Sequence, residues 1–107
     1  MTMHPTLNID PATHTGLRTV LTITGALDMD TVPHITAATD PLALSGRTLV
    51  LDLAAVTFMD SAGLNTLLIL RNRAEAEQGT LELRGLADQA LRLLDITCAR
   101  PLFTLTP

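Results

Sequence analysis

Residues 48–65 read TLVLDLAAVTFMDSAGLN, and this stretch decides the fold. Its first six residues are nearly all apolar, which predicts a central strand that is covered on both faces and parallel to its neighbours. The following residues, VTFMDSAG, form a junction at which this strand gives way to a helix. Ser61 follows a carboxylate there, where a helix start offers unpaired backbone N–H groups. The role of Ser61 therefore bears directly on function.

Strands and helices alternate on both sides of this junction. Residues 17–24 alternate apolar and polar side chains, as in a half-buried strand, while residues 11–16 read as a turn. Asp30 or Thr31 can cap a first helix, with Pro33 in its first turn. The remaining predicted elements are strands at 7–9, 80–85 and 102–106, a helix at 63–78 and a third helix with Leu86, Ala90, Leu93 and Leu94 on its apolar face.

This order, β-β-α-β-α-β-α-β, predicts an α/β fold with a mixed, mostly parallel sheet and right-handed crossovers. The length of 107 residues suits one domain spanning residues 1–107. The starting Met1 and the full set of elements favour a free-standing protein over a domain cut from a membrane transporter. The N-terminus lacks the features of a signal peptide, and no apolar run approaches the ~18 residues that span a bilayer. We expect a cytoplasmic protein without a membrane partner.

Composition excludes several kinds of partner and cofactor. The net charge is −4, all seven basic residues are arginines, and the chain has two Phe but no Tyr or Trp. Nucleic acid binding would need a basic stripe, usually with aromatic side chains for stacking. His4, His14 and His34 have no ligand-like spacing with each other or with Cys98, so no metal site is predicted. Cys98 lies in an apolar stretch, which favours a packed small hydrophobe over a reactive thiol.

The sequence also argues against an enzyme. A serine nucleophile elbow needs a small residue two positions before the serine, and Met59 stands there. All three histidines precede Ser61, which excludes the hydrolase order of serine, acid and histidine. A phosphate-accepting receiver domain would need a lysine near its last strand, and the chain has none. We therefore expect a protein that acts by occupying a surface, without catalytic residues or cofactors.

Two interpretations of Ser61 remain open on spacing alone. In one, Asp60 or Ser61 simply caps the helix, which contributes about 1 kcal/mol. In the other, the junction is a binding surface. Gly63 favours the second interpretation, because glycine in a first turn costs up to about 1 kcal/mol and is better explained if something approaches the backbone closely.

Four segments resemble the STAS domains, and in particular the bacterial anti-sigma factor antagonists. They are ITGALD at 23–28, LVLDLAAVTFMDSAGL at 49–64, TLELRG at 80–85 and LRLLDITCARPLF at 91–103. Together they cover nearly the whole chain in the order that the family has. The pattern DSxGL is specific where it follows such a strand and opens a helix.

The resemblance implies a phosphorylation switch in transcription regulation. In the family, the serine that corresponds to Ser61 is phosphorylated by a partner that is both a serine kinase and an anti-sigma factor, and a phosphatase is implied as a second partner. The unphosphorylated domain binds the kinase and so frees a sigma factor. The implied partner-binding residues are Asp28, Asp60, Ser61, Ala62, Gly63 and Asn65. The alternative is a STAS scaffold or ligand-sensing module that is not phosphorylated.

The chain departs from the family pattern at several positions. Ala62 stands where Ser or Thr is frequent, so no neighbouring hydroxyl can accept a phosphate. Asn65 replaces a frequent glycine, Ala26 a frequent acid, and Cys98 a frequent glycine. These differences leave the expected fold unchanged and bear on which kinase recognises the chain.

Overall fold

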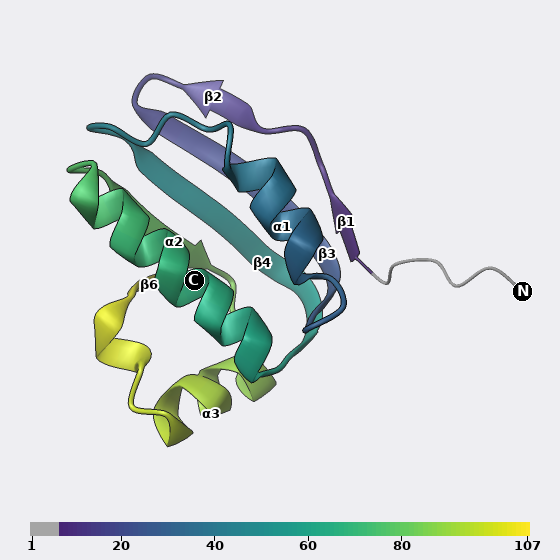
Figure 1. The fold of residues 1–107 in the computed structure, drawn as a ribbon. Coiled ribbons are helices and arrows are strands. Elements are labelled where there is room, and N and C mark those ends of the chain that lie inside the picture. Colours follow the sequence, from purple (N-terminus) through teal and green to yellow (C-terminus); the bar gives the residue numbers. More distant parts are fainter. Residues whose placement is uncertain (1–6) are drawn as a thin grey trace, which may run out of the picture.

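Six strands form one sheet in a computed structural model that describes residues 7–107 (Figure 1). The strand order is β1-β3-β4-β5-β6, and β2 also pairs with β3. The strands are β1 (Leu7–Ile9), β2 (Thr13–Thr15), β3 (Arg18–Leu27), β4 (Thr48–Met59), β5 (Thr80–Arg84) and β6 (Thr104–Thr106). The helices are α1 (Val32–Thr39), α2 (Ser61–Ala76) and α3 (Asp88–Ile96), and the short 3-10 helix η1 (Arg100–Leu102) leads into β6.

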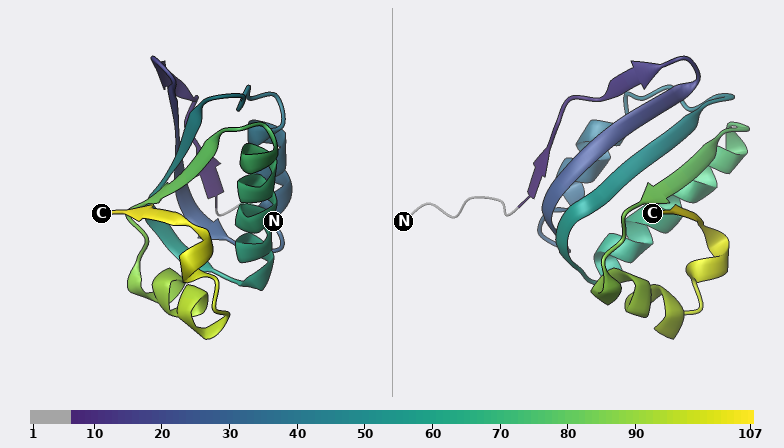
Figure 2. Two further views of the ribbon diagram at one scale, coloured as in Figure 1. Left: turned by 90° about the vertical axis from the view of Figure 1, so that its left-hand side faces the viewer. Right: turned by 180° about the vertical axis from the view of Figure 1, so that it is seen from behind.

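The sheet has the mixed, mostly parallel arrangement that the sequence predicts. Strands β3, β4, β5 and β6 are parallel to one another, and β1 and β2 run antiparallel to β3. Strand β4 lies in the centre of the sheet and continues to Met59, so it includes the first half of the segment expected to form the junction. Its leucines Leu49, Leu51 and Leu53 share one face of the strand and are fully buried. The prediction that both faces of this strand are covered is wrong, because the helices pack on one face of the sheet only (Figure 2).

Strand β2 is not predicted by the sequence and lies within the stretch expected to be a turn. All three of its residues are exposed, so it shows none of the alternation that marks a half-buried strand. Backbone pairing with β3 holds it, together with a hydrogen bond of 2.9 Å between His14 Nδ1 and Thr19 Oγ1. The actual order of elements is therefore β-β-β-α-β-α-β-α-β.

Helices α1 and α2 pack side by side on one face of the sheet, and the other face is free of helices (Figure 2). The free face is polar, with Arg18 paired to Glu82 at 3.3 Å across the strands. Helix α3 lies at the end of the sheet where β4 finishes, close to the start of α2 (Figure 1). This arrangement brings the β3–α1 loop, the end of β4, the start of α2 and the start of α3 to one end of the molecule.

Helix α2 begins and ends differently from the predicted 63–78. It begins at Ser61, because Asp60 caps it, and its last helical residue is Ala76. Gln78 adopts a left-handed conformation with φ of 60°, and the Gly79 N–H donates to the Ala74 carbonyl at 2.7 Å. This pattern is a Schellman motif, in which the residue after the cap reverses the chain.

Cys98 is exposed, so the prediction that it packs as a small hydrophobe is wrong. It terminates α3 with φ of 58°, while the Ala99 N–H donates to the Leu94 carbonyl at 2.8 Å. Glycine is the usual residue at this position of a Schellman motif because it has no Cβ to clash in the left-handed region. The frequent glycine of the family pattern therefore has a structural explanation here.

Replacing Cys98 by glycine is expected to stabilise the protein by about 1 kcal/mol. The left-handed conformation costs a residue with a Cβ roughly 1–2 kcal/mol, and glycine avoids this cost. Part of the gain is lost because glycine gives the unfolded chain more conformational freedom. Urea unfolding would measure the change. Cys98→Ala is the matched control, since it removes the thiol but keeps the Cβ, and its stability should match that of the wild type. Equal gains in both variants would show that the thiol, and not the backbone, is responsible.

Candidate functional site

Ser61 is exposed at the first residue of α2, directly after the buried Met59 and the half-buried Asp60. The strand thus gives way to the helix between Met59 and Ser61, as the sequence predicts. The N–H groups of Ser61 and Ala62 precede the first residue that can donate within the helix. The first intrahelical bond comes from Leu64, whose N–H donates to the Asp60 carbonyl at 3.0 Å. The Ser61 hydroxyl is therefore accessible beside unpaired backbone donors.

Asp60 connects two elements through its carboxylate. Its Oδ1 accepts the Gly63 N–H at 2.9 Å, which confirms the predicted helix cap. Its Oδ2 accepts the N–H of Met29 at 3.2 Å, in the loop between β3 and α1. Asp60 therefore fixes the start of α2 to that loop while leaving the neighbouring serine free.

Asp28 organises the β3–α1 loop. Its Oδ1 accepts the N–H groups of Asp30 at 3.0 Å and of Thr31 at 3.1 Å. Thr31 is buried, and its hydroxyl donates to the Ala26 carbonyl at 2.8 Å. Thr31 occupies the N-cap position of α1 but makes no side-chain cap bond, so the predicted capping of α1 by Asp30 or Thr31 is wrong in its mechanism. The structure places Asp28 and Asp60 on adjoining segments, joined through Met29.

Gly63 is required by the protein's own backbone. A Cβ at this position would collide with the carbonyl oxygen of Leu27, at the end of β3. The group that approaches the Gly63 backbone closely is therefore the Leu27 carbonyl of the same chain, and Gly63 is buried. Ala62 is half-buried and Asn65 is exposed on the next turn, so both lie beside Ser61 on α2.

Gln89 on α3, which the sequence does not point to, holds the last residue of β4. The Gln89 Nε2 donates to the Met59 carbonyl at 2.7 Å, and its Oε1 accepts the Met59 N–H at 2.8 Å. This pairing continues the sheet's hydrogen bonding with a side-chain amide. Nothing in the residues around Gln89 signals the contact, because its partner lies 30 positions earlier in the chain.

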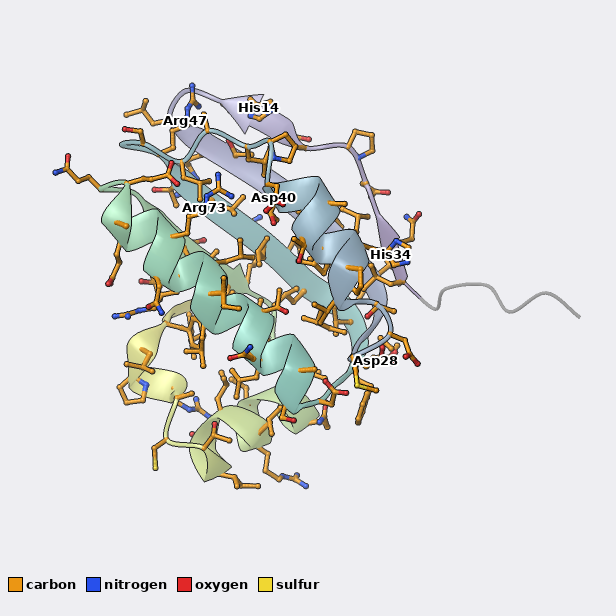
Figure 3. The ribbon with its side chains drawn as sticks, viewed as in Figure 1. His14, Asp28, His34, Asp40, Arg47 and Arg73 are labelled. Carbon is orange, nitrogen blue, oxygen red and sulfur yellow. The ribbon has the colours of Figure 1, made fainter. Side chains whose placement is uncertain are left out.

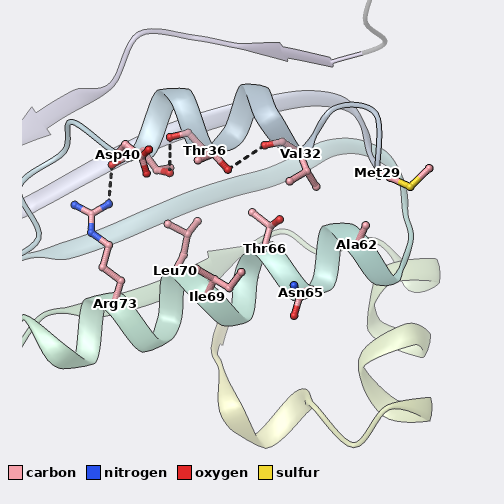
Figure 4. A pocket seen from close by; sticks show the side chains of 11 residues that line it. Met29, Val32, Thr36, Asp40, Ala62, Asn65, Thr66, Ile69, Leu70 and Arg73 are labelled. Atoms are coloured by element: carbon pink, nitrogen blue, oxygen red, sulfur yellow. Dashed lines mark hydrogen bonds between the residues drawn. The ribbon is translucent and has the colours of Figure 1, made fainter.

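A groove of about 280 Å³ runs between α1 and α2 from the Ser61 end of the molecule (Figure 4). Met29, Ala62 and Asn65 line its near end, and Arg73 lines its far end. Ile69 lies on its wall and is 58% exposed, and Met29 is 71% exposed. The sequence predicts an apolar stripe of Leu64, Leu67 and Leu68 on the second helix, and Ile69 lies outside it.

The histidines are not brought together (Figure 3). His14 lies on β2 and His34 on α1, while His4 is outside the described residues. Within residues 7–107, no group of three or more His, Cys, Asp or Glu side chains could hold a metal ion.

Asp60→Ala is expected to destabilise the protein by about 1–2 kcal/mol, because it removes the cap of α2 and the acceptor for the Met29 N–H. Asp60→Asn keeps a capping oxygen and should lower the stability by only a few tenths of a kcal/mol. Urea unfolding would compare them with Asp30→Ala, which removes an exposed carboxylate from the same loop and should change stability by less than about 0.5 kcal/mol. Equal losses for Asp60→Ala and Asp30→Ala would contradict the assigned role of Asp60.

Comparison with known proteins identifies the family. Residues 12–98 match the family described as Mlab, STAS domain. The anti-sigma-B factor antagonist of Bacillus subtilis (strain 168) is 33% identical over 75 residues, which are 70% of this chain and 69% of that protein. The chain therefore belongs to the STAS domain family, and the resemblance seen in the sequence is confirmed.

Solved structures share the fold. An anti-sigma factor antagonist from Mycobacterium paratuberculosis superposes with a TM-score of 0.81 and 24% identity, covering 94% of this chain and 86% of that one. The Bacillus cell fate determinant SpoIIAA in its phosphorylated form superposes with a TM-score of 0.69 and 20% identity, covering 94% of this chain and 91% of that one. None of the helices in residues 7–107 is long and apolar enough to cross a membrane.

Proposed function

We propose that this chain is an anti-sigma factor antagonist controlled by phosphorylation of Ser61. In its unphosphorylated form it binds an anti-sigma factor that is also a serine kinase, and a sigma factor is released. Phosphorylation of Ser61 ends the complex, and a phosphatase restores it. The observation that carries this proposal is the exposed Ser61 hydroxyl at a helix start whose backbone Asp60 and Gly63 hold in place.

The fold can accept a phosphate at this position. The N-terminus of α2 carries the positive end of the helix dipole, and a phosphate there also meets the unpaired N–H groups of Ser61 and Ala62. Because Ser61 is exposed, the added group needs no space in the core. We therefore expect phosphorylation to change the surface and leave the fold intact.

The same phosphate would oppose the partner. A serine kinase places the phosphates of its nucleotide beside the hydroxyl that it modifies, so after transfer two phosphate groups face each other. A phosphate adds about −1.5 to −2 charges, and a single like-charge contact at ~4 Å with an effective dielectric of ~20 is of order 4 kcal/mol before screening. Even half of that weakens binding by more than ~10-fold.

Purification of the tagged chain from its native cells tests the proposal. The retained proteins should include an anti-sigma factor that, given Mg-ATP, phosphorylates Ser61 and then dissociates. Ser61→Ala should retain the same protein with or without Mg-ATP. Recovery of an anti-sigma factor that dissociates equally from both chains would contradict the switch.

The groove beside Ser61 favours a second candidate, a STAS scaffold or sensing module that binds a protein or small ligand without phosphorylation. Its lining reaches the first turn of α2 through Ala62 and Asn65, so an occupant could act on the same surface. In this case Ser61 is only part of the helix start. A phosphate on Ser61 in cells separates the two candidates.

A further inference from the structure

The groove between α1 and α2 has the properties of a protein docking site. We propose that it receives an amphipathic helix of the partner, with an apolar stripe facing Met29, Val32 and Ile69 and basic residues facing Asp30 and Asp40. The inference rests on the proposed function, because the docking helix is taken to belong to the same partner protein that covers Ser61. It adds the chemistry of the segment that docks and the place where it lies.

Large apolar side chains in the groove are exposed to solvent. Ile69 sits in the middle of α2 with 58% of its side chain exposed, and Met29 reaches 71% from the neighbouring loop. Both line one groove with the half-buried Val32 and the buried Leu70 (Figure 4). Methionine and large apolar side chains gathered in a concave surface are typical of sites where a helix inserts its apolar face.

The charges around the groove select a basic partner. Asp30 and Asp40 are exposed and lie just before and just after α1. Asp40 stands at the C-terminus of α1, where the helix dipole disfavours a carboxylate, and it takes part in no salt bridge within residues 7–107. A cation from a partner would relieve this unfavourable placement.

Arg73 is a basic residue that lines the groove, and its guanidinium is hydrogen-bonded to other groups of the chain. It donates from Nη1 to the Thr39 carbonyl at 2.9 Å, from Nη2 to the Leu42 carbonyl at 2.5 Å, and from Nε to Glu77 at 2.9 Å. These bonds tie α2 to the end of α1 and keep the groove's far wall in place. The guanidinium is therefore held by these three acceptors and forms no direct salt bridge with the Asp40 carboxylate.

The spacing of the two carboxylates defines the docking helix more closely. Ten positions separate Asp30 from Asp40, and α1 fills most of the interval, so they lie roughly 15 Å apart at 1.5 Å per helical residue. A docked helix lying along α1 would therefore carry Arg or Lys about ten positions apart, with apolar residues at i, i+3, i+4 and i+7 between them. Ala62 and Asn65 form the end of the groove nearest Ser61. A phosphate on Ser61 would obstruct the docked helix there, because it would occupy part of the same space.

Site-specific photo-crosslinking in native cells tests the proposal. The crosslinker p-benzoylphenylalanine would replace Thr36 and Ile69 in the groove, Phe58 near Ser61 but outside the groove, and Thr104 on the helix-free face. We expect Thr36 and Ile69 to crosslink to one segment of one protein, with basic residues about ten positions apart, and Thr104 to give no adduct with that segment. Crosslinks to a second copy of this chain, to an uncharged or acidic segment, or to a lipid would overturn the proposal, as would their absence.

A charge substitution adds a quantitative test. Asp40→Asn should reduce the yield of the Ile69 crosslink at least threefold without lowering the Tm, because it removes a carboxylate from a helix C-terminus. Glu75→Gln, which removes an exposed carboxylate of α2 outside the groove, is the matched control and should keep the yield. Equal yields for Asp40→Asn and the wild type would overturn the basic character of the partner.

The crosslinks test the docking groove separately from the phosphorylation switch. Crosslinks to the predicted kind of segment in a protein that never phosphorylates Ser61 would support the groove and contradict the switch. Crosslinks from Phe58 alone to a kinase that phosphorylates Ser61 would support the switch and overturn the groove.

Discussion

Ser61→Asp is expected to keep the fold and to weaken binding of the anti-sigma factor by more than tenfold. The substituted carboxylate lies at an exposed helix start, where the dipole and the free N–H groups of the first turn stabilise a negative charge. In the proposed complex, the same carboxylate would face the nucleotide phosphates of the kinase. The repulsion estimated for one close contact, of order 4 kcal/mol before screening, is large enough for this loss even when reduced by half.

Isothermal titration calorimetry with the isolated anti-sigma factor would measure the effect. Ser61→Ala should bind like the wild type, which separates charge from loss of the hydroxyl. Thr104→Asp places the same charge on an exposed residue of β6, on the helix-free side, and should also bind like the wild type. A Ser61→Asp variant with unchanged affinity and an unchanged unfolding curve would count directly against the switch.

Gly63→Ala is expected to destabilise the protein by at least about 2 kcal/mol, because the new Cβ would collide with the Leu27 carbonyl oxygen. Backbone atoms cannot move aside as the end of a flexible side chain can, so α2 would have to shift away from β3. The better helix propensity of alanine offsets at most about 1 kcal/mol of this cost. A decrease of this size corresponds to a Tm lower by roughly 10 °C in a domain of this length.

Thermal unfolding would compare Gly63→Ala with Asn65→Ala, an exposed change on the same helix that should alter stability by less than about 0.5 kcal/mol. The comparison also decides between two explanations of the glycine. If a partner's close approach were the reason for it, Gly63→Ala would keep its stability and lose only binding. Equal stability in the two variants would therefore contradict the internal explanation.

The central part of the fold could be predicted because its signals are local. The apolar run from Leu49 to Leu53 indicates a central strand, although helices cover only one of its faces (Figure 2), and Asp60 before a predicted helix indicates a cap. The strand and the helix start therefore follow from neighbouring residues. The family resemblance then supplied the expected function of Ser61. The presence of Gly63 was noticed for the right reason, a close backbone approach, although its neighbour turned out to be Leu27.

The remaining features depend on contacts between distant segments. Strand β2 exists only because β3 pairs with it, and Gln89 finds its partner Met59 across 30 positions. The groove likewise arises from the packing of α1 against α2, which leaves Ile69 exposed although its own helix gives no sign of it. Cys98 was misread because its apolar surroundings suggested burial, whereas its backbone conformation at the end of α3 places it on the surface.

Phosphorylation of Ser61 is tested by intact-mass spectrometry of the protein from its native cells, with fragmentation to locate any modification. We expect one added phosphate on Ser61 under at least one growth or stress condition, and its loss in Ser61→Ala. A chain that carries no phosphate under any of these conditions, or carries it only at another residue, would contradict the switch and leave Ser61 as the first residue of α2.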